Sequence, residues 1–273
     1  PLNRRQRQMC IRDRLLSNEI SDKNIFVHKD YSIPKQVKKF KPLCLFISYS
    51  GNTEETLSGI SDAKINNFDW LVISSGGKLI DMAKNEGKEY IQIPNGLQPR
   101  AAFGYLTLAV SKIVDIGEGS NYVSELNDVS LYIDKLSDKG DESDINKLSI
   151  DICESINKKT VIIYSGTDMS RVVSSRWKTQ INENAKSKAF IGNLPEVHHN
   201  EILSWDADKD GSKKNYIVIF IRDQNEHPQI KKRFELTKDL IGEKVNITEV
   251  NIANQESTCL LYTSPSPRDG VQS

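Results

Sequence analysis

Residues 43–56 read LCLFISYSGNTEET: an apolar run, a short turn of Ser, Gly and Thr, and the start of a stretch that favours a helix. An apolar run that leads into a helix through a short polar turn is typical of a parallel α/β sheet. Such a turn directs backbone N–H groups and hydroxyls toward one point, and the helix dipole adds positive potential there. The stretch therefore predicts a fold class and an anion site together.

Within this stretch, Ser48, Ser50 and Thr53 supply neutral hydrogen-bond donors, and Gly51 lets the backbone approach an anion closely. The pattern GxxxxGK[ST] is missing, so the turn is not a nucleoside triphosphate loop. The same letters also fit a Ser or Thr helix cap followed by acidic first-turn residues. From the turn alone, an anion site and a simple helix cap explain the sequence equally well.

Short apolar runs alternate with helix-forming stretches in two series along the chain. The first series predicts strands at residues 24–28, 43–49, 70–74 and 89–93. The second series predicts strands at residues 160–164, 189–191, 216–221 and 245–251. Helices are expected at residues 101–116, 169–183 and 228–241. Two α/β units of about one hundred residues each follow from this alternation.

The two ends of the chain differ from the rest. Residues 1–14 are rich in arginine, residues 259–273 are rich in Ser and Pro, and neither run has a helical or strand period. Both are interpreted as non-native, adapter-like tails, with genuine disordered tails as the alternative. The remaining chain divides into a first domain at 15–116, a helical linker at 117–149 and a second domain at 150–258.

Composition excludes several classes of protein. The 273 residues carry 37 Lys plus Arg and 37 Asp plus Glu, which argues against a nucleic-acid binder. The longest apolar stretch, about residues 101–110, is too short to cross a bilayer. The cysteines are isolated, which fits a reducing compartment and predicts neither a zinc site nor a disulfide framework. They are Cys10, Cys44, Cys153 and Cys259. We therefore expect a cytoplasmic protein.

Several segments together resemble a known family. SYSGNTEETL at 48–57 is similar to the phosphosugar-binding signature of the sugar isomerase (SIS) domain, and ISSGGKLIDMA at 73–83 also fits that domain. RWKTQINENAK at 176–186, HNEI at 199–202 and HPQIKKRFELT at 227–237 look like the bifunctional phosphoglucose/phosphomannose isomerase family. The resemblance covers about residues 14–256. It implies two SIS domains, each a flavodoxin-like parallel sheet flanked by helices.

The resemblance also implies a reaction, the interconversion of glucose 6-phosphate or mannose 6-phosphate with fructose 6-phosphate through a cis-enediolate. Glu183 matches the base that moves a proton between C1 and C2, and His199 matches the residue that opens the sugar ring. Arg100 matches the cation that stabilises the enediolate. The phosphate is expected on Ser48, Ser50 and Thr53. No cofactor and no metal are expected, and relatives imply a homodimer with shared active sites.

The sequence also departs from the family pattern. Family members begin with a strand and a Gly-rich turn, and nothing of that kind precedes Asn24. Members end with a helix that bears a lysine, and the match stops near Glu256. We therefore expect an internal fragment whose first domain lacks its first strand. As a fragment, it is expected to be inactive and weakly protected from amide exchange over residues 15–116.

Two alternatives from the same domain class remain open. One is a non-catalytic SIS sensor that binds a sugar phosphate, although no recognition helix or basic face is apparent. The other is the isomerase domain of glucosamine-6-phosphate synthase, against which the RWKTQINENAK and HNEI segments argue. The adjacent His198 and His199, with Glu201 nearby, resemble metal ligands only superficially, because no third ligand has a suitable spacing.

Overall fold

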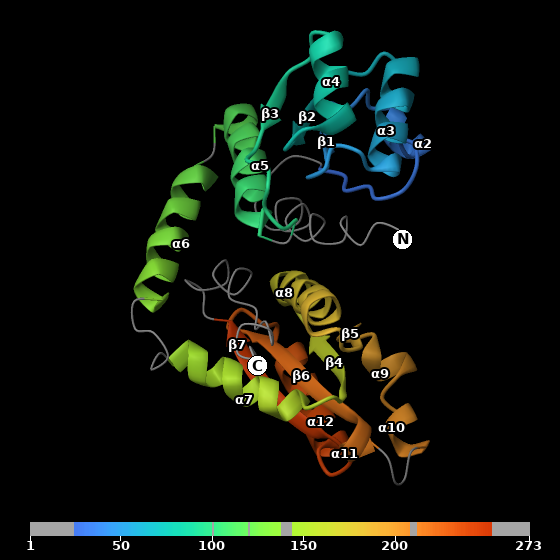
Figure 1. Cartoon of the computed structure of the whole chain (residues 1–273). Helices are drawn as coiled ribbons and strands as arrows, with labels where there is room; N and C mark the ends of the chain where they lie inside the picture. The colour runs from blue at the N-terminus through green and yellow to red at the C-terminus, as the bar shows by residue number, and fades with distance from the viewer. Residues whose placement is uncertain (1–24, 100, 120, 138–143, 208–211, 253–273) are drawn as a thin grey trace. The chain divides into compact units, whose positions relative to one another are not determined.

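The computed structural model describes residues 25–99, 101–119, 121–137, 144–207 and 212–252 (Figure 1). The chain divides into two compact units, Pro1–Leu126 and Asn127–Ser273, and the division lies within the helix α6 (Tyr122–Ser137). This helix lies in the stretch that the sequence analysis assigned to a linker. Each unit has its own sheet and its own core.

The first unit contains a parallel sheet in the order β1-β2-β3. Its described strands are β1 (Cys44–Ile47), β2 (Trp70–Ser74) and β3 (Tyr90–Gln92). Its helices are α2 (Lys35–Lys38), α3 (Glu54–Ile65), α4 (Gly77–Asn85) and α5 (Phe103–Glu118). Three of the four predicted strands are confirmed, with ends that differ by up to two residues.

The first sheet buries side chains on both of its faces. Val72 of β2 packs in a cluster with Ile60 of α3 and Leu79 of α4. The next residue, Ile73, packs in a separate cluster with Leu106 of α5. Successive side chains of a strand point to opposite faces, so helices must cover both sides of this sheet. The predicted α/β class is confirmed.

The second unit contains a parallel sheet in the order β5-β4-β6-β7. Its strands are β4 (Thr160–Ser165), β5 (Ala189–Asn193), β6 (Tyr216–Asp223) and β7 (Asn246–Ile252). The longer helices are α7 (Asp144–Ile156), α8 (Asp168–Gln180) and α12 (Pro228–Ile241). Three short helices are α9 (Val197–Asn200), α10 (Ser204–Ala207) and α11 (Ser212–Asn215). With β4 as the first strand, the order is 2-1-3-4, which is flavodoxin-like as predicted.

Aromatic rings form the centre of the second core. The rings of Tyr164 and Phe220 lie 6.3 Å apart, and those of Phe220 and Phe234 lie 5.1 Å apart. All three side chains are fully buried. The guanidinium of Arg222 lies 4.4 Å from the Phe234 ring centre and forms an ion pair with the buried Glu226 at 3.0 Å. These contacts allow a charged residue to lie near the end of the apolar strand β6.

The strand predicted at residues 24–28 is wrong for the residues that the structure describes. Residues 25–29 form no strand, and Phe26 is 59% exposed; Asn24 lies outside the described residues. A β-branched run becomes a strand only when a neighbouring strand supplies its ladder of hydrogen bonds. In the described part of the chain, β1 pairs with β2 and with no strand on its other side.

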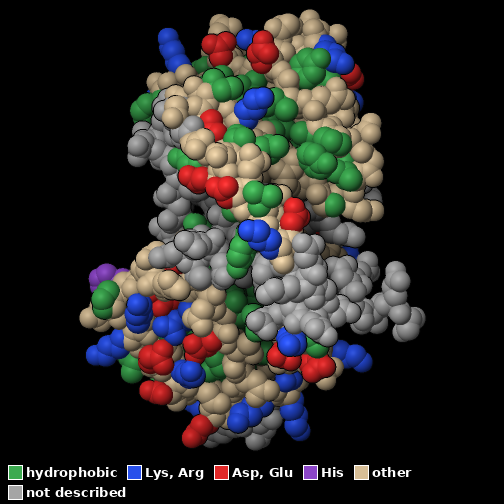
Figure 2. Space-filling view, turned by 90° about the vertical axis from the view of Figure 1, so that its left-hand side faces the viewer, with side chains coloured by type: hydrophobic (Ala, Val, Ile, Leu, Met, Phe, Trp, Pro, Cys, Tyr) green, Lys and Arg blue, Asp and Glu red, His purple; other side chains and the backbone are tan. Residues whose placement is uncertain are grey.

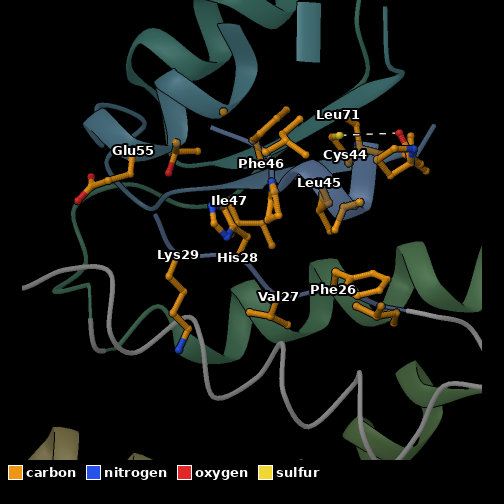
Figure 3. A pocket seen from close by; sticks show the side chains of 18 of the residues that line it. Phe26, Val27, His28, Lys29, Cys44, Leu45, Phe46, Ile47, Glu55 and Leu71 are labelled. Carbon is orange, nitrogen blue, oxygen red and sulfur yellow. Dashed lines mark hydrogen bonds between the residues drawn. The ribbon is translucent and has the colours of Figure 1, made fainter. Parts of the chain in front are cut away.

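A groove of about 370 Å³ lies beside the outer edge of β1. Its walls come from residues 25–34, from β1 and from the inner face of α5 at Val110 and Val114. Figure 3 shows Leu45 and Ile47 of β1 across the groove from Val27. The segment predicted as a strand therefore lines an apolar groove.

The described surface combines charges of both signs with apolar side chains. Figure 2 shows Lys and Arg side chains interspersed with Asp and Glu on the second unit, and apolar side chains gathered on the first. On α5, Tyr105, Leu108 and Ile116 are exposed. Among the described helices, none combines the length and the apolar character needed to span a bilayer.

Amide exchange should distinguish the two edges of β1. The amides of Cys44 and Ser48 donate to carbonyls on the β2 side, Asp69 at 2.8 Å and Ile73 at 3.1 Å. Alternate amides of a strand point in opposite directions, so those of Leu45 and Ile47 point away from β2. We expect them to exchange at least about tenfold faster than their neighbours in NMR-detected exchange.

The control for this measurement is β6, which pairs on both sides. Its alternate amides at Val218, Ile219 and Phe220 should be protected to a similar degree, because β4 and β7 flank them. Equal protection of all amides in β1 would contradict the open edge.

Candidate functional site

The turn that follows β1 is closed by a hydroxyl pair. Ser48 Oγ and Thr53 Oγ1 lie 2.6 Å apart, and both side chains are buried. Thr53 occupies the N-cap position of α3, yet its side chain accepts no hydrogen bond from the helix. The first N–H groups of a helix need an acceptor from outside the helix, and an anion meets that need. The alternative explanation is correct about position, because Thr53 is the N-cap residue and Glu54 and Glu55 follow it, but the side-chain hydrogen bond of such a cap is not formed.

A second turn, at residues 74–77, interlocks with the first. Gly51 has φ of +66°, and a Cβ atom there would lie 1.7 Å from the carbonyl oxygen of Gly76. Ser75 donates to the Tyr49 carbonyl from both its N–H and its Oγ, at 3.0 and 2.6 Å. The Lys78 amide donates to Asn52 Oδ1 at 3.1 Å. The two turns therefore form one rigid body at the carboxyl ends of β1 and β2.

Tyr49 extends this body to the segment that follows β3. Its hydroxyl donates to the Pro94 carbonyl at 3.2 Å and accepts from the Leu97 amide at 2.8 Å. Because the hydroxyl both donates and accepts, it fixes the direction of the chain that leads toward residue 100. Arg100 itself, predicted to stabilise the enediolate, lies outside the described residues.

The first unit therefore offers hydroxyls, backbone amides and a helix N-terminus within one turn. Ser50 is half-buried, and its Oγ lies 3.4 Å from the Asn52 amide. These donors are neutral, and Glu54 and Glu55 follow directly in the first turn of α3. Such a set can hold a phosphate through directed hydrogen bonds and needs no lysine within the turn.

Cys44, at the start of β1, is not a nucleophile. Burial raises the pKa of its thiol to about 11, and the Asp62 carboxylate adds to the rise. A thiol with this pKa is almost wholly protonated at neutral pH, and the thiolate is the reactive form.

Glu183 lies on an irregular turn of helix. α8 ends at Gln180, and a π-helical turn, η3 (Ile181–Ala185), continues it. The helix predicted at residues 169–183 is confirmed, and its last turn is π-helical. The wider turn ends at Lys186, whose φ is +56° and whose Nζ donates to the Glu183 carbonyl at 2.5 Å. Single π turns occur frequently at functional sites.

A row of buried polar side chains runs along α8 into this turn. Arg176, Gln180 and Asn184 are each no more than 6% exposed. The amides of Gln180 and Asn184 contact each other at 2.5 Å. With the Gln180 amide reversed, its oxygen accepts from Arg176 Nη2 at 2.6 Å and its nitrogen faces the Asn184 amide. Sequence analysis did not identify this row, although its i, i+4, i+8 spacing in RWKTQINENAK is a visible signal.

His199 lies on α9 and is exposed, whereas His198 beside it is half-buried. Glu201 accepts a hydrogen bond from the Tyr164 hydroxyl at 2.5 Å, so its carboxylate is turned toward the core. Among the described residues, His, Cys, Asp and Glu form no group that could hold a metal ion.

The structure divides the predicted site residues between the units. It brings the three phosphate-turn residues Ser48, Ser50 and Thr53 together in the first unit. Glu183 and His199 both belong to the second unit, on η3 and α9.

Replacing Gly51 with alanine should destroy the phosphate turn. The new Cβ would clash with the Gly76 carbonyl and force a positive φ on alanine. We expect a loss of more than about 2 kcal/mol in the free energy of unfolding of the first unit. Inorganic phosphate binding, measured by calorimetry, should disappear with it.

Gly87 provides the matched control, because its φ is +62° and a Cβ there would meet nothing within 4 Å. Gly87→Ala should cost only about 1 kcal/mol and leave phosphate binding intact. If the two variants behave alike, the contact between the two turns is unimportant.

Comparisons with known proteins identify the fold and the family of this chain. Residues 145–263 match the model of the bacterial phospho-glucose isomerase C-terminal SIS domain. The C-terminal domain of glucosamine-fructose-6-phosphate aminotransferase from Francisella tularensis has a similar fold, with a TM-score of 0.60 and 13% identity. That structural match covers 96% of this chain and 79% of the other.

Curated relatives match over most of the chain. The bifunctional phosphoglucose/phosphomannose isomerase of Aquifex aeolicus is 35% identical over 226 residues, which cover 83% of this chain and 66% of the relative. The Thermoplasma acidophilum enzyme of the same name is 35% identical over 240 residues, 85% of this chain and 69% of the relative. The chain thus spans about two thirds of the length of these relatives. It belongs to the bifunctional phosphoglucose/phosphomannose isomerase family.

Proposed function

We propose that the protein interconverts fructose 6-phosphate with glucose 6-phosphate, mannose 6-phosphate or both. The observation that carries this proposal is the interlocked turn at residues 48–53, whose hydroxyls and uncapped helix amides suit a sugar phosphate. The described residues contain no metal-binding cluster, and this reaction needs none, because it moves protons only.

The chemistry assigned to Glu183 is proton transfer between two carbons. Its carboxylate takes the proton from C2 of the aldose and returns it to C1, while a proton passes from the C2 hydroxyl to the C1 oxygen. The π turn supports this role, because it widens the helix at Glu183 and changes the direction of the side chain. Arg100 is assigned to the charge on the enediolate.

His199 is assigned to ring opening. A sugar that enters as a ring needs a proton at its ring oxygen and loses one from its C1 hydroxyl, and imidazole exchanges protons near neutral pH. His199 is exposed on a short helix, so it is accessible to a ligand. The same exposure would let it serve a neighbouring subunit.

We further propose a homodimer with shared active sites in the cytoplasm, where the reaction would serve glycolysis and gluconeogenesis. The two described cysteines, Cys44 and Cys153, are free, which supports a reducing compartment. A non-catalytic sensor would also bind the sugar phosphate, and it would have no use for Glu183. Variants at Glu183 therefore separate the two possibilities.

Glu183→Gln should abolish turnover and preserve binding. The protein for this test is a chimera in which the unmatched third of the Aquifex aeolicus relative is joined to this chain. We expect kcat to fall by about a thousandfold, because an amide cannot take the C2 proton. The measurement is loss of deuterium from C2-labelled substrate, together with phosphate affinity by calorimetry.

Ser50→Ala serves as the contrasting variant, because it should weaken the binding of phosphate and the binding of substrate to a similar degree. Near wild-type deuterium loss in Glu183→Gln would remove this residue from the mechanism. A chimera that binds phosphate and never exchanges C2 deuterium would favour the sensor.

Mixing two inactive variants tests the shared site. If His199 of one subunit completes the site of its partner, subunit exchange between Glu183→Gln and His199→Ala chimeras yields hybrids with one intact site. When exchange is random and complete, about half of the dimers are hybrids, and each hybrid has one intact site of two. We therefore expect about a quarter of the activity of the same amount of wild-type chimera. Complete exchange, verified by native mass spectrometry, with no recovered turnover would show that each site is self-contained.

A further inference from the structure

The imidazole of His198 is hydrogen bonded at both of its nitrogens. Nε2 lies 2.7 Å from Thr237 Oγ1, and Nδ1 lies 3.1 Å from Arg233 Nη1. Both partners belong to α12, whereas His198 belongs to α9. A single side chain therefore joins the short helix that bears His199 to a long helix packed in the core.

These partners determine which nitrogen carries the proton. A guanidinium only donates hydrogen bonds, so Nδ1 must accept from Arg233 with its lone pair. The Thr237 hydroxyl donates its own hydrogen to the Arg233 carbonyl at 2.7 Å, so its oxygen accepts from Nε2–H. The ring is thus neutral, with its hydrogen on Nε2. A protonated ring would direct an N–H at the guanidinium, and that bond would be lost.

The other side of α9 is also anchored. Glu201, which follows α9, accepts a hydrogen bond from the hydroxyl of the fully buried Tyr164 at 2.5 Å. The Tyr164 hydroxyl oxygen in turn accepts a hydrogen bond from Trp205 Nε1 at 3.1 Å. Burial, followed by the Glu201 carboxylate, raises the pKa of Tyr164 well above its usual range, so the hydroxyl remains a donor. His199 lies between these two anchors.

A helix of four residues has too few internal hydrogen bonds to hold its own direction. The direction of α9 must therefore come from its contacts outside the helix. Val197 packs its start into the core, and the anchors at His198 and Glu201 lie on either side of His199. On the basis of the proposed function, we propose that His198, held neutral between Arg233 and Thr237, is a positioning residue that orients His199.

The arrangement also determines how stability and activity depend on pH. Burial lowers the pKa of His198 below its usual value, and the positive charges of Arg233 and His199 lower it further. Glu196 and Glu201 are the acidic residues flanking α9 in sequence. The lowered pKa means that His198 takes up a proton more readily in the unfolded chain than in the folded one. The free energy of unfolding is therefore highest above the unfolded pKa of histidine, about 6.5, and it falls as the pH drops from there toward the lower pKa of the folded state. Positioning of His199 is lost over the acidic part of this range.

Thr237→Val tests the anchor without touching either histidine. Valine has the shape of threonine and lacks the acceptor for Nε2–H, whereas Thr237→Ser keeps it. In the chimera, we expect Thr237→Val to lower kcat at least about tenfold with little change in KM, because the phosphate turn lies in the other unit. Thr237→Ser should recover most of the rate.

A second readout does not require activity. The chain has four histidines, so a histidine-specific nitrogen NMR spectrum can be assigned by substitution. We expect the wild-type His198 to show the Nε2–H tautomer at neutral pH. Thr237→Val should change the ring signals of His198 and His199. Thr107→Val is the matched control, since Thr107 is also buried and bonds the carbonyl four residues earlier, at 2.9 Å; it should change neither ring.

Arg233→Met completes the test. Removing the cation should raise the pKa of His198, so the acidic limb of the activity profile moves to higher pH. The proposal would be overturned if the acidic limb of the pH–activity profile does not move in Arg233→Met, or if the histidine NMR signals are unchanged in Thr237→Val. If the chimera has no isomerase activity while the ring signals respond as expected, the proposed function fails and the anchoring of His199 stands.

Discussion

Parallel pairing brings the carboxyl ends of neighbouring strands to the same edge of a sheet, and the site in the first unit depends on this constraint. The register pairs Ile47 with Ile73, so the turns that begin at Ser48 and Ser74 start side by side. The Ser48 amide donates to the Ile73 carbonyl at 3.1 Å, which extends the ladder into the turn. Gly51 then approaches Gly76 so closely that any side chain would be excluded. The hydroxyls and amides of the site are consequences of this backbone contact.

Sequence reasoning could predict most strands because each carries its signal in a few consecutive residues. Trp70–Ser74 and Tyr216–Asp223 are apolar runs bounded by polar turns, and a parallel sheet buries them on both faces. The segment at 24–28 carries the same local signal and is not a strand in its described part. Strand pairing depends on a neighbouring strand that a local pattern cannot reveal, so the local pattern alone wrongly predicted a strand in this segment. The interlocking of the two turns was unpredictable for the same reason, since it joins residues 25 positions apart.

The two adjacent histidines show how one letter pattern can hide two roles. On any regular element, successive side chains diverge, which argued against a shared metal site. The pattern could not show which histidine faces inward, because α9 is too short to have an amphipathic period. The answer lies in α12, where Arg233 and Thr237 are four positions apart and therefore present their polar atoms on one face. Together they fit the imidazole of His198, and His199 is left exposed.

The segment RWKTQINENAK concentrates buried polar side chains on one helix. Arg176, Gln180 and Asn184 are buried in a row where leucine or isoleucine would fill the space without the cost of removing polar groups from water. The helix that carries them also abandons α-helical geometry at Ile181, just before Glu183. Natural sequences accept such local penalties mainly where function requires particular groups in particular places. Two independent penalties, one of burial and one of backbone geometry, coincide within eleven residues. This coincidence supports the assignment of Glu183 on physical grounds that do not depend on the family resemblance.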